Sequence, residues 1–175
     1  FLYDLGLRYP QGIDPQGTGG LLEEAFAAAV RNASESDSFD RLVLRENLRW
    51  RQVAILRSYA KYMRQMGNMN SYGFISDTLL ANPEVTRGLI ALFEARFDPD
   101  LNSTEREEAT ESVRRTLDSH LEQVPTLDAD RVLRTLANVI EATLRTNYFQ
   151  DKHHISYKLN TSVIEGAPHP RPKFE

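Results

Sequence analysis

The pattern of apolar and polar positions is most regular between Arg49 and Met66. Apolar residues recur there at spacings of three and four, the period of one face of an α-helix: Trp50, Val53, Leu56, Tyr59, Met63 and Met66. No proline or glycine interrupts the run, and Gly67 follows where a left-handed residue commonly ends a helix. The spacing predicts a central helix over Arg49–Met66, roughly 27 Å long at about 1.5 Å per residue.

A second long run of helical periodicity begins after Pro125. Thr126 is a suitable N-cap residue, and the apolar positions that follow are Leu133, Ala137, Ile140, Leu144 and Tyr148. The breadth of this face favours a partner helix of similar length, and Arg49–Met66 is the obvious one. We expect the two helices to pack against each other in the core.

Shorter amphipathic segments surround these two helices. They are predicted over Leu21–Val30, over Phe39–Leu48 with a bend near Asn47, over Tyr72–Leu79, over Pro83–Phe97 with Asn82 as N-cap, and from a capping box at Thr104–Glu107 to Val124. The last of these has a thin apolar stripe, so we expect it at the periphery. The glycine-rich residues 11–20 are interpreted as a connecting loop, because they match neither phosphate-binding glycine pattern.

Two segments alternate between apolar and polar residues, as half-buried strands do. They are Phe1–Tyr9 and His154–Asn160, and we expect them to pair because either strand alone would be marginal. The predicted fold is mainly α, a bundle of about six or seven helices with a small β-sheet pairing N- and C-terminal strands. Residues 1–165 would form one helical domain, followed by a proline-rich linker at 166–175.

Composition is typical of one globular domain. The chain has 175 residues, 41% of them hydrophobic and 26% charged, and its apolar runs are far shorter than the ~20 residues that cross a membrane. The absence of cysteine excludes disulfides and thiolate metal sites and fits a reducing compartment, so we expect a cytoplasmic location. No signal peptide is visible, and the first residue, Phe1, suggests a piece of a longer protein.

Charge is unevenly distributed along the chain. Residues 41–64 include seven basic residues and one acidic residue, whereas residues 84–130 include twelve acidic residues and five arginines. This asymmetry fits a nucleic-acid surface or attraction between two parts of one fold, and we favour the second. Within the basic segment, the ridge of Arg57, Lys61 and Arg64 is interpreted as a solvated face or a contact with acidic neighbouring structure.

The strongest metal-ligand candidates are His153 and His154 with Asp151. Adjacent residues of a strand point to opposite faces, so a structural or solvated role is favoured for them. The sequence has no Gly-x-Ser-x-Gly or His-Glu-x-x-His motif and no carboxylate pair in a context that suggests acid/base chemistry. From the residues alone, we therefore assign no catalytic, cofactor-binding or metal site.

Several segments resemble the large bacterial NAD-specific glutamate dehydrogenases, in the order in which that family has them. They are Trp50–Val53, Leu56–Tyr59, Asp77–Leu79, Ala91–Pro99, Glu141–Gln150 and Pro170–Glu175, with a weaker likeness at Tyr3–Leu7. Each likeness is modest alone, and together they are specific.

The resemblance implies a parent oxidoreductase that converts L-glutamate, NAD and water to 2-oxoglutarate, ammonia and NADH. It also implies that this chain is the helical region immediately before the catalytic domain, ending before the family's glycine-rich substrate segment, catalytic lysine and dinucleotide fingerprint. No catalytic or cofactor-binding residue is therefore transferred to this sequence, and the segment alone is expected to be inactive. NAD would bind elsewhere in the parent enzyme.

For the segment itself, the resemblance implies a scaffolding, oligomerisation or regulatory role. Its partners would be the catalytic domain of the same chain and neighbouring subunits, because the family enzymes are oligomers. Two alternatives stay open: a free-standing helical module that binds nucleic acid, or one that binds a small effector.

Overall fold

The computed structural model describes residues 6, 8, 9, 11–170 and 172–175. In this part of the chain the helices are α1 (Pro15–Val30), α2 (Arg41–Arg45), α3 (Trp50–Gln65), α4 (Tyr72–Ala81), α5 (Pro83–Phe97), α6 (Ser103–Leu121) and α7 (Leu127–Ala142). Three 3-10 turns, η1 (Ser38–Asp40), η2 (Tyr148–Gln150) and η3 (Thr161–Val163), accompany two strands, β1 (Thr143–Thr146) and β2 (Tyr157–Leu159). The mainly helical class with a small sheet is confirmed.

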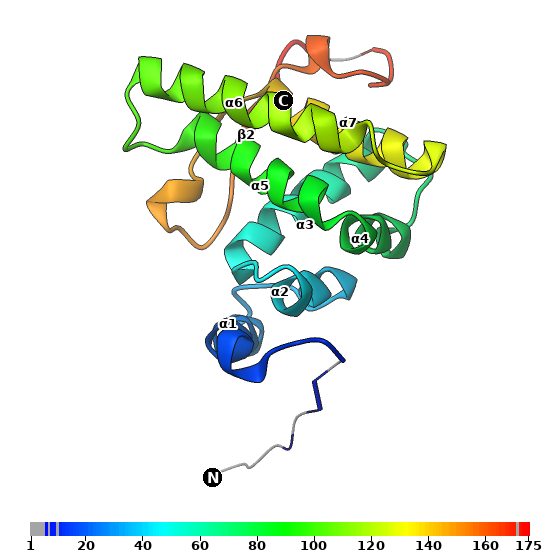
Figure 1. Cartoon of the computed structure of the whole chain (residues 1–175). Coiled ribbons are helices and arrows are strands. Elements are labelled where there is room, and N and C mark those ends of the chain that lie inside the picture. The colour runs from blue at the N-terminus through cyan, green and yellow to red at the C-terminus, as the bar shows by residue number, and fades with distance from the viewer. Residues whose placement is uncertain (1–5, 7, 10, 171) are drawn as a thin grey trace.

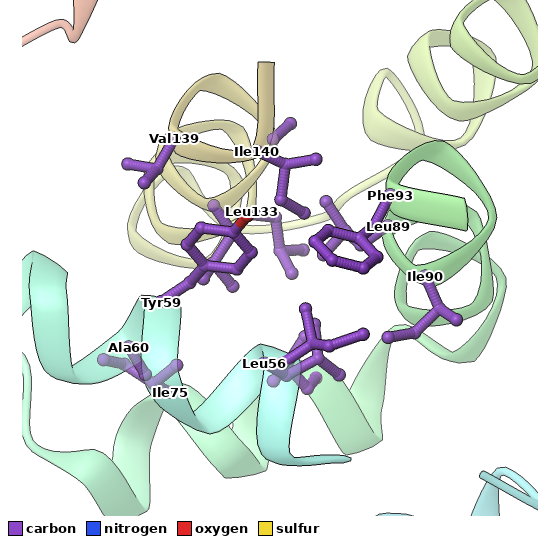
Figure 2. Close-up of a cluster of buried hydrophobic side chains, with 14 of the residues drawn as sticks. Leu56, Tyr59, Ala60, Ile75, Leu89, Ile90, Phe93, Leu133, Val139 and Ile140 are labelled. Carbon is purple, nitrogen blue, oxygen red and sulfur yellow. The ribbon is translucent and has the colours of Figure 1, made fainter. Parts of the chain in front are cut away.

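The core lies between α3, α5 and α7, with α4 closing one side. Leu56 and Tyr59 from α3 point toward Leu133 and Ile140 from α7, and Phe93 from α5 completes the cluster (Figure 2). All five side chains are buried. The predicted packing of the two long helices is therefore confirmed. In Figure 1, α1 lies at one end of the molecule and α6 at the other.

The ends of α3 agree with the sequence pattern. Arg49 is the N-cap residue, and its backbone N–H donates to the Gln52 side chain at 2.9 Å. Met66 is the C-cap residue, and Gly67 follows with a φ of +90°, a conformation that costs glycine little. The break before α3 also lies where a bend is predicted, since Asn47 has a φ of +53°.

The interpretation of residues 11–20 as a loop is wrong from Pro15 onward. The Asp14 carboxylate accepts hydrogen bonds from the backbone N–H groups of Gln16 and Gly17, and Pro15 occupies the first turn. This cap and the fixed φ of proline favour a helix start strongly enough to carry three glycines inside α1.

The start of α6 is shifted from the predicted capping box. Asn102 is the N-cap residue, and its backbone N–H donates to the Glu105 carboxylate at 3.0 Å. The helix lies at the periphery as expected, because only Leu117 and Leu121 among its residues are buried. It packs along α5, where Gly88 allows Leu117 to approach closely.

The prediction that the last long helix reaches Tyr148 is wrong. Helix α7 ends at Ala142, and β1 pairs antiparallel with β2, with an irregularity between Thr143 and Arg145. The predicted C-terminal strand is thus present as β2, and β1 is its partner in the described sheet. The strand predicted for Phe1–Tyr9 lies mostly outside the described residues.

Residues 166–170 are irregular and lead to Phe174, which forms an isolated antiparallel bridge with Asn160. Ile164 and Ala167 are buried, so the chain after β2 stays against the helical core. No helix in the described ranges combines the length and apolarity that a membrane crossing requires.

Candidate functional site

The most developed polar arrangement lies where α3 meets the β1–β2 hairpin. The hydroxyls of Tyr59 and Thr143 are 2.8 Å apart, and both side chains are buried. Thr143 donates its own hydrogen to the Val139 carbonyl at 2.9 Å, so Tyr59 is the donor of the pair. Burial, above all other influences, raises the pKa of Tyr59 well above its ordinary value of 10.0.

A second hydroxyl pair joins α3 to β2. Ser58 donates to the Ile55 carbonyl at 2.7 Å and accepts from the Tyr157 hydroxyl at 2.8 Å. The Tyr157 ring packs against that of Tyr59, with centroids 4.8 Å apart, and burial also raises the pKa of Tyr157. Because both phenols stay protonated at neutral pH, they serve as hydrogen-bond donors and not as general bases.

Arg51 fastens the loop after β1 to the first turn of α3. Its guanidinium donates to the Tyr148 carbonyl at 2.9 Å, pairs with Asp151 at 3.1 Å and lies over the Tyr148 ring. Asp151 has a φ of +49°, so the loop turns sharply at the residue that Arg51 holds. These contacts fix η2, whose Phe149 is partly exposed.

Arg96 caps the end of α7. Its Nη2 donates to the carbonyls of Glu141 at 2.8 Å and Thr143 at 3.0 Å, where the helix leaves acceptors without intrahelical partners. Burial lowers the pKa of Arg96 below its ordinary value, and the buried Nε lacks a hydrogen-bond partner. The Glu141 side chain in turn accepts from Arg114 of α6 at 2.7 Å.

The ridge predicted on α3 is not a continuous solvated face. Arg57 is only 4% exposed; it pairs with Asp37 at 2.9 Å and with Asp40 at 2.7 Å, and Lys61 pairs with Glu35. The predicted contact with acidic neighbouring structure is therefore confirmed for these two residues. Arg64 lies over the Tyr72 ring and donates to the Asn70 carbonyl at 3.2 Å.

We predicted that residues 41–64 and 84–130 attract each other, but the basic residues of the first segment do not pair with the acidic residues of the second. Within the described ranges, the basic residues of the first segment pair with Glu35, Asp37, Asp40, Asp77 and Asp151, all outside the second segment. One ion pair joins the two segments with the opposite polarity, from Glu46 to Arg87 at 2.7 Å.

The histidine candidates do not converge. Among the residues that the structure describes, no three His, Asp or Glu side chains form a group that could hold a metal ion. Asp151 is engaged by Arg51, and His153 lines a cleft of about 660 Å³ together with Arg57, Ser58 and Lys61.

Sequence reasoning missed Asp37, Asp40, Arg96 and the hydroxyl partners of α3. The two aspartates had a local signal, because Asp37 and Asp40 form a capping box around η1. The contacts of Arg96 and Tyr157 join residues 45 and 99 positions apart, and spacing along the sequence carries no sign of them.

Two family models match the chain. Residues 34–99 match helical motif 3 of glutamate dehydrogenase, and residues 116–175 match the catalytic domain of bacterial NAD-glutamate dehydrogenase. The NAD-specific glutamate dehydrogenases of Pseudomonas aeruginosa and Halomonas elongata are 35% and 38% identical to this chain over its whole length. That of Mycobacterium tuberculosis is 35% identical over 95% of the chain. The chain spans 11% of the length of each relative.

The two matched stretches meet inside one folded core. The first contains α3 and α5, and the second begins within α6 and contains α7, β1 and β2. The contacts from Tyr59 to Thr143, from Ser58 to Tyr157 and from Arg51 to Tyr148 therefore join one stretch to the other. The division into a domain at 1–165 and a linker at 166–175 stays a prediction.

Proposed function

Because the chain belongs to the bacterial NAD-specific glutamate dehydrogenase family, we propose that it is a supporting segment of such an enzyme, without a reaction centre of its own. The parent enzyme would convert L-glutamate, NAD and water to 2-oxoglutarate, ammonia and NADH. In this proposal the helical stretch 34–99 is a scaffold that holds the beginning of the catalytic domain in place. A cytoplasmic location belongs to the same proposal and rests on the NAD specificity that the relatives' names state.

The buried pair of Tyr59 and Thr143 carries this proposal. It is a side-chain hydrogen bond between the two matched stretches, and both partners are fully enclosed. A hydrogen bond of this kind contributes roughly 0.5–1.5 kcal/mol relative to the solvated groups, so this contact favours the state in which the two stretches are packed together. The Arg51 and Arg96 contacts add charged donors to carbonyls of the second stretch, which fixes its orientation as well.

The residues that the structure describes do not fit an NAD site of the doubly wound type. Such a site requires parallel strands and a glycine-rich turn at a helix N-terminus. The strands of the described chain form one two-stranded antiparallel sheet, and its most glycine-rich stretch lies at and within α1. We therefore assign NAD to other parts of the parent and route no chemical step through these residues.

The alternative of a nucleic-acid-binding module loses its main support. Such a module would need the ridge of Arg57, Lys61 and Arg64 on α3 to contact the phosphates of the nucleic acid. Arg57, however, is buried and paired with two carboxylates, and Lys61 pairs with Glu35. We still propose that the partners of this segment are the rest of the catalytic domain and neighbouring subunits of an oligomeric parent.

Two measurements test the proposal. The purified 175-residue chain should neither bind NADH in a fluorescence titration nor form NADH from glutamate and NAD, whereas the full-length parent should do both. In the parent, Tyr59→Phe should lower the temperature at which NADH formation is lost and leave KM for glutamate unchanged. Activity of the isolated chain would refute a segment without a reaction centre, and a changed KM with unaltered thermal stability would refute the scaffold role.

A further inference from the structure

Strand β2 uses one of its edges for β1. The Asn160 N–H donates to the Ala142 carbonyl at 2.8 Å, and the Ser156 carbonyl accepts from the Asn147 N–H at 3.4 Å. Backbone groups alternate in direction along a strand, so those of Tyr157 and Leu159 face the opposite edge. β2 therefore presents a second edge.

The last residues of the chain lie along this second edge. Leu159 and Glu175 exchange two backbone hydrogen bonds, of 2.6 and 3.1 Å, and Asn160 is bridged antiparallel to Phe174. The Tyr62 hydroxyl donates to the Glu175 carboxylate at 2.7 Å, which anchors the same segment to α3. Phe174 and Glu175 thus pair with β2 in the antiparallel direction.

Among the residues that the structure describes, none pairs with the edge of β2 beside Tyr157. In the described residues, no backbone hydrogen bond reaches Tyr157 from this side. A cleft of about 470 Å³ lies against the hairpin and is lined by residues of β1, of β2 and of the chain end, among them Arg145, Lys158 and Glu175. An unpaired strand edge is a template for another strand, and a sheet of two short strands gains stability from a third.

We propose that this edge is a docking site for an extended polypeptide segment, and that its occupant is the stretch that follows Glu175 in the full-length parent. The inference rests on the proposed function, since the relatives match this chain end to end while it spans only 11% of their length. Antiparallel pairing adds main-chain hydrogen bonds without any rearrangement of β2.

The register fixes the role of each added residue. The Leu159–Glu175 pair places the first residue after Glu175 opposite Lys158, with its N–H and C=O turned away from β2. The second residue lies opposite Tyr157 and exchanges both hydrogen bonds with it. Its side chain would share the inner face of the sheet, where the Tyr157 ring packs against Tyr59 and Phe93, so an apolar residue would fit this position.

Amide hydrogen exchange tests the docking. We measure exchange at the Tyr157 and Leu159 amides in the 175-residue chain and in the full-length parent. The Tyr157 amide should exchange at least about 10-fold more slowly in the parent, while the Leu159 amide, already bonded to Glu175, should change little. Equal exchange of Tyr157 in the two proteins would overturn the proposal.

Two proline variants of the parent separate strand pairing from simple burial by other parts of the protein. Proline at the second position after Glu175 removes the N–H that bonds to Tyr157 and should return its amide to the fast exchange of the short chain. Proline at the first position, whose N–H points away from β2, should keep the protection. Identical exchange rates of the Tyr157 amide in both proline variants would refute the proposed pairing register of the added strand with β2. NADH formation from glutamate, measured on the unaltered parent, tests the proposed function separately.

Discussion

The Tyr59 hydroxyl donates to the Thr143 hydroxyl across 2.8 Å, at the residue where the chain leaves α7 and becomes β1. Thr143 is the C-cap residue of α7, with extended backbone angles, and its own hydroxyl donates back to Val139 of that helix. A residue of α3 thus holds the boundary between a helix and a strand 84 positions away. Loss of this bond should therefore loosen the hairpin as well as the core.

Tyr59→Phe should destabilise the chain by about 1–2 kcal/mol, because it removes a buried hydrogen bond and leaves the ring packing intact. Urea unfolding followed by circular dichroism measures the change. Tyr62→Phe is the matched control: it removes an exposed hydroxyl bond to Glu175 and should change stability by less than about 0.5 kcal/mol. Equal losses of stability in the two variants would contradict a larger contribution from the buried hydroxyl of Tyr59 than from the exposed hydroxyl of Tyr62.

Arg57→Met should cost about 2 kcal/mol. Loss of one partner from a fully buried pair costs roughly 3–5 kcal/mol, and the effect is smaller here because the Asp37 and Asp40 side chains are 33% and 37% exposed. Lys61→Met breaks an exposed pair on the same helix and should cost less than about 1 kcal/mol. Urea unfolding of both variants checks this order, and a larger loss for Lys61→Met would reverse the argument.

The two central helices could be predicted from the sequence because their apolar periodicity is long and their boundaries are local. Arg49, Gly67 and Thr126 mark three of those boundaries, and each acts on its neighbours within four residues. The fourth boundary, at Ala142, could not be predicted, since it depends on Arg96 and Tyr59 from distant helices. Periodicity continues past this point to Tyr148, but tertiary contacts override it.

The candidate site could be predicted only in part, for a similar reason. A helical projection places Arg57 opposite the apolar stripe of α3, and such a position is normally solvated. In the structure the segment 34–40 covers it and supplies both carboxylates. The sequence allowed a contact with acidic neighbouring structure, but it could not say which acidic residues would fold over the helix.

Gly88→Val should destabilise the chain by about 1–3 kcal/mol, because a Cβ at this position lies only 3.0 Å from Leu117 Cδ1 and would push α6 away from α5. Thermal unfolding followed by circular dichroism measures the loss. Gly20→Ala in α1 is the counterpart, since nothing lies within 4 Å of its added Cβ. It should raise stability by about 0.5–1 kcal/mol through helix propensity, and destabilisation there would contradict the helical assignment of the glycine-rich stretch.

Glu46→Gln should remove one contribution to the pH dependence of the free energy of unfolding at acidic pH. The Glu46 side chain is only 6% exposed, and burial raises its pKa above the ordinary 4.5 despite the opposing charge of Arg87. The folded state therefore binds more protons than the unfolded state between 4.5 and the raised value, so this group makes stability fall as pH rises through that window. Glutamine keeps an acceptor for Arg87 and removes the titration. Urea unfolding from pH 4 to 7 should show a stability gain for the variant that grows with pH, and a gain that shrinks with pH would reverse the sign of the assigned shift.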